Sequence, residues 1–98
     1  MPKTTESLLA VDVQAVLHRR KALQHLRVRV RGKVVTIESG PHDDAFPHAR
    51  LRRVTTQYWR LEMPTHRGRW EPTPVEGVLR DVLTALMDEF AWTLAPID

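Results

Sequence analysis

The sequence predicts a single α+β domain over residues 1–98, with a mostly antiparallel sheet of five to six strands. Three observations predict it. Apolar residues recur at helical spacing near both ends of the chain, and short runs in the middle alternate apolar with charged residues between tight turns. A length of 98 residues suits one hydrophobic core. Because short turns favour hairpins, we expect the order α-β-β-β-β-β-α-β, with the N-terminal and C-terminal helices packed on one face of the sheet.

The first element is a predicted helix that starts at Thr4 or Thr5, either of which can cap it. The apolar residues of this segment recur at helical spacing as far as Leu23. The basic run 19–21 then falls in the last turns of the helix, where cations complement the negative end of the helix dipole.

The clearest strand signal is a hairpin formed by residues 26–31 and 34–38, joined by Gly32-Lys33. A two-residue turn with glycine first is typical of a type II′ hairpin, and it sets the register with Arg27 opposite Glu38. In this register Val28, Val30, Val35 and Ile37 share one face of the hairpin. The other face carries Arg27, Arg29, Arg31, Thr36 and Glu38.

A second hairpin follows an exposed loop at residues 40–48. Its strands, 49–54 and 58–63, are separated by three residues, which pairs Leu51 with Leu61. The same register places Arg50 opposite Glu62 and Arg52 opposite Arg60 on the polar face.

In the last third of the chain we expect a turn at 64–68 and a short strand at 69–71 that ends at Pro72. A helix should follow. Thr73-Pro74-Val75-Glu76 has the pattern of a capping box, and the apolar stripe that follows extends to Phe90. A final strand at 91–94 stops at Pro96.

Charge is unevenly distributed along the chain. Residues 19–69 carry thirteen bases against four acids, whereas residues 70–98 carry one base against six acids. Of the fifteen bases, twelve are arginine, whose planar guanidinium suits phosphate and carboxylate. The excess of positive charge in residues 19–69 favours an anionic partner.

The candidate site is the arginine face of the predicted sheet. Arg52 directly opposite Arg60 is unfavourable unless an anion lies between them, and the predicted registers leave several arginines without an acid directly opposite. We therefore expect a non-catalytic protein that binds RNA or DNA, with Tyr58 on the same face as a possible stacking platform for a base. The predicted anion-binding residues are Arg29, Arg31, Lys33, Arg52, Arg60 and Tyr58.

Two alternatives remain open. The first is a protein-interaction module of the immunity, antitoxin or adaptor type, which captures a partner or forms a homodimer through its charge poles and a strand edge. Exposure of Trp70 together with the segment around Trp92 would mark such a surface. The second is a small ribonuclease that uses His66 as a general acid and base, although no nucleophile or orienting carboxylate lies near it in sequence.

Other classes of function find no support. The chain has no cysteine, and the spacing of His42, Asp43, Asp44 and His48 matches no established zinc pattern. We therefore assign no catalytic residue, metal or cofactor. No stretch approaches the roughly 20 apolar residues of a membrane span, and no secretory signal opens the chain, so we expect a cytoplasmic protein without a membrane partner.

Overall fold

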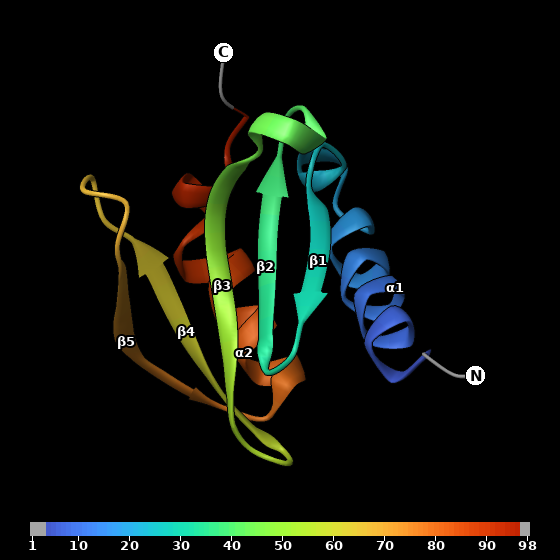
Figure 1. The fold of residues 1–98 in the computed structure, drawn as a ribbon, viewed down its shortest axis with the longest axis vertical. Coiled ribbons are helices and arrows are strands. Elements are labelled where there is room, and N and C mark those ends of the chain that lie inside the picture. The colour runs from blue at the N-terminus through green and yellow to red at the C-terminus, as the bar shows by residue number, and fades with distance from the viewer. Residues whose placement is uncertain (1–3, 97–98) are drawn as a thin grey trace.

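The computed structural model describes residues 4–96 and consists of one five-stranded antiparallel sheet with two α-helices (Figure 1). The strands follow one another as a meander, in the order β1-β2-β3-β4-β5. The α-helices are α1 (Thr4–His18) and α2 (Leu79–Glu89), and the strands are β1 (Arg27–Arg31), β2 (Val34–Ser39), β3 (Phe46–Thr55), β4 (Tyr58–Pro64) and β5 (Trp70–Gly77). Three 3₁₀ turns, η1 (Lys21–Leu23), η2 (His42–Asp44) and η3 (Ala91–Leu94), connect or follow them. The predicted fold class is confirmed.

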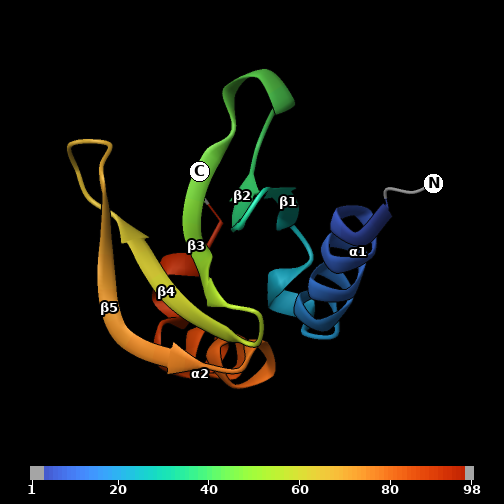
Figure 2. The ribbon, with the colours of Figure 1, turned by 60° about the horizontal axis from the view of Figure 1, so that its bottom comes forward.

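Both helices cover the same face of the sheet, as expected. Figure 2 shows α1 beside β1 and α2 along β4 and β5. Leu17 of α1 and Leu86 of α2 are fully buried in one apolar cluster with the inward side chains of the strands. No helix among the described residues is long and apolar enough to cross a membrane.

The register of the first hairpin is as predicted, from Arg27 opposite Glu38 to Arg31 opposite Val34. Gly32 in its turn has a φ of +59°, a conformation that glycine adopts without strain. The alternation of buried and solvent-facing residues therefore matches the pleat, and all the arginines of β1 lie on the face away from the helices.

The second hairpin also has the predicted register, with Leu51 opposite Leu61 and Arg52 opposite Arg60. It closes more tightly than expected, because Thr55 pairs with Tyr58 and the ladder shifts between Arg53 and Thr55. A bulge thus absorbs the extra residue that we assigned to a three-residue loop.

The prediction that a capping box at Thr73 starts the second helix is wrong. β5 continues through Pro72 and Thr73 to Gly77, and α2 begins at Leu79, with Val78 as its N-cap. The Thr73 hydroxyl donates to the carbonyl of Leu61 in β4 and accepts from the amide of Val75, so it is satisfied within the sheet. Prolines are tolerated here because β5 is an edge strand.

Three further boundaries differ from the prediction. The basic run 19–21 follows α1 instead of forming its last turns, since the helix ends at His18. The loop after β2 ends at Ala45, and His48 is buried within β3. Residues 91–94 form the 3₁₀ turn η3 instead of a sixth strand, and Leu94 packs into the core from there.

Candidate nucleic-acid interface

The candidate interface is the face of the sheet that neither helix covers, called the open face here (Figure 1). Alternation along the strands places every second side chain on it. Its charged residues come from all five strands, and the strand pairing brings them into neighbouring rows. They are Arg27, Arg29, Arg31, Glu38, Arg50, Arg52, Arg60, Glu62 and Glu76.

Two buried carboxylates each bind a pair of arginines on the open face. Glu38 lies 3.3 Å from Arg27 and 3.2 Å from Arg29, and its side chain is only 6% exposed. Glu62, 8% exposed, lies 2.5 Å from Arg50 and 3.3 Å from Arg52. A buried carboxylate is costly unless it is paired and hydrogen-bonded, and two guanidinium groups meet that need. Each trio retains one positive charge.

The remaining arginines of the open face differ in their pairing. Arg60 donates from Nε to Glu76 at 2.6 Å. Arg31 makes no ion pair with any residue that the structure describes. Six arginines therefore face three glutamates, which leaves an excess of three positive charges on the open face.

The expectation that no acid lies directly opposite the four predicted arginines is wrong for Arg60 alone. Arg29 and Arg52 do lack an acid directly opposite, but each reaches a glutamate diagonally across the ladder. Arg60 does have a glutamate directly opposite, because Glu76 lies in β5 and not in a helix. The repulsion between Arg52 and Arg60 is therefore offset within the protein, and it no longer argues for an anion between them.

Trp70 lies on the open face, where sequence reasoning did not place it. The guanidinium carbon of Arg50 lies 4.5 Å from the centre of the indole ring, a cation–π stack. Trp70 also borders a hollow of about 550 Å³ whose lining includes Arg29, Arg31 and Arg50 along with Glu38 and Asp43. Trp70 has this position because it pairs with Pro64 of β4. The sequence predicts only a short strand at 69–71, and the pairing partner of Trp70 cannot be read from it.

Two predicted residues lie at the margin of the open face. Lys33 is exposed in the β1–β2 turn, and Tyr58, 42% exposed, begins β4 beside the β3–β4 turn. Both turns lie at the lower end of the sheet in Figure 1, away from the β4–β5 turn. Trp70 is the first residue of β5 after that turn. The structure thus gathers the four predicted arginines on one face and leaves Lys33 and Tyr58 at its end.

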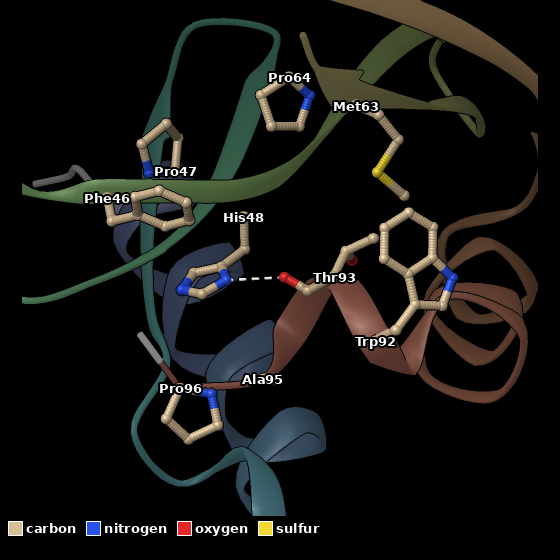
Figure 3. Close-up of a pocket in the computed structure, with 9 residues that line it drawn as sticks. All are labelled: Phe46, Pro47, His48, Met63, Pro64, Trp92, Thr93, Ala95 and Pro96. Atoms are coloured by element: carbon tan, nitrogen blue, oxygen red, sulfur yellow. Dashed lines mark hydrogen bonds between the residues drawn. The ribbon is translucent and has the colours of Figure 1, made fainter. Parts of the chain in front are cut away.

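A separate apolar groove of about 310 Å³ lies at the other end of β3 and β4, beside η3 (Figure 3). Phe46, Pro47, Met63 and Pro64 line one side, and Trp92, which is 75% exposed, forms a wall on η3. Trp92 is the most exposed of the large hydrophobic residues that the structure describes.

His48 connects this groove to the core. Its Nδ1 donates to the carbonyl of Thr93 at 2.8 Å (dashed in Figure 3), and its Nε2 accepts from the Ser39 hydroxyl at 2.7 Å. His25 donates from Nε2 to the carbonyl of Leu94 at 2.7 Å, so two histidines hold η3. Burial lowers the pKa of His48 below its usual value of 6.5; the bond to Thr93 opposes this shift, and nearby His25 adds to it.

The structure does not assemble the other residues considered for chemistry. His42, Asp43 and Asp44 are exposed on η2, while His48 points into the protein. Among the described residues, no cluster of three or more histidine, aspartate or glutamate side chains can hold a metal ion. His66 is exposed in the β4–β5 turn beside Arg67, and no hydrogen bond from the described residues orients its ring.

Comparison of the chain with models of protein families, with curated proteins and with solved structures finds no match.

Proposed function

We propose that this chain is a non-catalytic binding protein whose open face binds RNA or DNA. One observation carries the proposal: the open face bears six arginines against three glutamates, and no helix covers it. A surplus of guanidinium groups on a broad, accessible surface is suited to the phosphates of a nucleic-acid strand.

The glutamates leave phosphate-binding capacity in place. Arg52 and Arg60 both donate to their glutamates through Nε, so their terminal nitrogens remain for another acceptor. The ion pairs also hold these long side chains across the sheet before a ligand arrives. Less side-chain entropy is then lost on binding than for freely rotating arginines.

The proposal predicts that replacing three arginines of the open face with neutral residues removes most of the affinity for nucleic acid. We choose the triple variant Arg29→Gln, Arg31→Gln and Arg52→Gln, because Glu38 and Glu62 keep Arg27 and Arg50 as partners. The affinity for a labelled oligonucleotide, measured by fluorescence anisotropy at low salt, should fall by at least about tenfold. The salt dependence should weaken too, by roughly 2 in the log–log slope for a single strand.

The matched control removes the same charge away from the open face. Arg19→Gln, Lys21→Gln and Arg80→Gln replace three exposed cations on the helix side of the molecule. This variant should retain most of the wild-type affinity. Equal losses in both triple variants, or no binding by the wild type at low salt, would refute a role for the open face.

A second candidate function is protein–protein interaction, and the exposed Trp92 in its apolar groove favours it. A large aromatic side chain beside a concave apolar surface is typical of contacts between proteins. The test is the molecular mass in solution of the wild type and of a Trp92→Ser variant.

A further inference from the structure

We infer that the ligand of the open face is a single-stranded nucleic acid and that one of its bases stacks on Trp70. The inference rests on the proposed function and specifies its substrate class. It comes from the position of one indole ring, because three separate hollows meet at Trp70.

Two of the three hollows are basic. The first is the hollow of about 550 Å³, where three arginines (Arg29, Arg31 and Arg50) outnumber two acids (Glu38 and Asp43). The second, about 620 Å³, is lined by Arg67, Arg69 and His66 of the β4–β5 turn, together with Glu71 and Thr65. Guanidinium groups thus line two different hollows that both border the indole, and each hollow is suited to a phosphate of a bound strand.

The third hollow, about 470 Å³, is mainly apolar. Phe46, Pro47 and Pro64 line it together with Trp70 and the β4–β5 turn. An apolar recess beside an indole is suited to the flat face of a base, and phosphates would be excluded from it by their desolvation cost. Besides Trp70, this recess shares Pro47 with the first basic hollow and Thr65 and His66 with the second, so it adjoins both. A base in the recess would then have basic hollows next to it for the phosphates of the same strand.

A duplex does not fit this arrangement. Its bases are stacked on one another and present only their edges in the grooves, so none can lie flat on a protein side chain. Trp70 is also held in place, because Arg50 stacks on it and is itself bonded to buried Glu62. A fixed aromatic ring loses little entropy when a base stacks on it.

The other two tryptophans and the tyrosine are less suited to this role. Trp59 is 6% exposed and belongs to the core. Trp92 lies in a groove that no arginine lines. Tyr58 borders none of the three hollows around Trp70.

The experiment compares three labelled probes in fluorescence anisotropy at one salt concentration: a strand of about 12 thymidines, an abasic strand of equal length, and a duplex of equal length. The wild type should bind the thymidine strand roughly 5- to 150-fold more tightly than the abasic strand, as expected for one stacked base. It should also bind the thymidine strand more tightly than the duplex.

Variants then assign the base-dependent affinity to a side chain. Trp70→Leu should bind the thymidine strand no better than the abasic strand, with the affinity for the abasic strand unchanged. Trp70→Phe, which keeps a ring, should retain part of the difference, and the control Trp92→Leu should retain all of it. Circular dichroism establishes that each variant is folded.

The outcomes separate this inference from the proposed function. Equal binding of thymidine and abasic strands by the wild type, or equal binding of strand and duplex, overturns the inference while anion binding by the open face stands. If none of the probes binds, the proposed function fails as well. The comparison within the wild type decides the matter even if Trp70→Leu does not fold.

Discussion

His48 illustrates how a single side chain joins distant parts of this chain. It bonds Ser39 of β2 on one side and the carbonyl of Thr93 in η3 on the other, and its ring is 1% exposed. Because a carbonyl can only accept, Nδ1 carries a proton, and burial, which lowers the pKa of His48, favours the neutral ring. The sequence places this histidine in a polar stretch, and we predicted an exposed loop there.

The lowered pKa of His48 predicts a loss of stability in mild acid. Below the unfolded-state pKa of 6.5, the histidine binds a proton in the unfolded chain but not yet in the folded chain. The free energy of unfolding therefore decreases as the pH is lowered from 6.5 to the folded-state pKa. Urea unfolding from about pH 7.5 to about pH 5.5 should show this decline. His48→Gln, which cannot titrate, should show a flatter profile; an equally steep one would contradict the assignment.

At the scale of the element, β5 and the start of α2 depart most from expectation. Thr73 and Glu76 have the spacing of a capping box, but Thr73 bonds to Leu61 of β4 and to the amide of Val75. Glu76 pairs with Arg60, which also lies in β4. Local capping preference is worth about 1 kcal/mol, whereas pairing with β4 satisfies a whole run of backbone groups. The larger contribution decides the structure.

This arrangement leaves α2 without a side-chain cap and predicts a stabilising substitution. Val78 is the N-cap, has an extended backbone and is 43% exposed. Val78→Ser should raise the free energy of unfolding by about 0.5–2 kcal/mol relative to Val78→Ala, which loses the same apolar surface but adds no cap. Thermal unfolding should resolve this as roughly 4–8 °C per kcal/mol, and equal melting temperatures would exclude the cap.

At the scale of the whole molecule, the open face carries an excess of positive charge, whereas the helix side carries exposed charges of both signs. The basic middle of the chain supplies the open face, and the acidic residues of α2 lie on the helix side. An exposed ion pair at 2.8 Å joins Arg20, which follows α1, to Asp88 of α2. The two surfaces are therefore available to different partners.

The groove at Trp92 leads to a prediction about the assembly. If this groove pairs two copies of the chain, light scattering after size-exclusion chromatography should give twice the mass of 11.3 kDa for the wild type. Trp92→Ser should then elute as a monomer, because a polar side chain replaces the largest exposed apolar surface. A monomeric wild type at high concentration would exclude self-pairing and leave capture of another protein.

The amino-acid sequence by itself determined the two hairpins and their registers. Residues such as Val28 and Arg29 alternate so strictly that a shift by one position would bury arginine, and short turns leave no other pairing. It therefore also determined that the arginines share one face. The pairs of Arg27 with Glu38 and Arg50 with Glu62 follow from these registers as well. Only the tertiary structure decided that Arg29, Arg52 and Arg60 also reach glutamates. It alone decided where Trp70 lies, that Pro72 stays in a strand, and that Leu94 closes the core from a 3₁₀ turn. These outcomes depend on contacts between residues far apart in the chain, whose free energies exceed the local preferences that sequence patterns report.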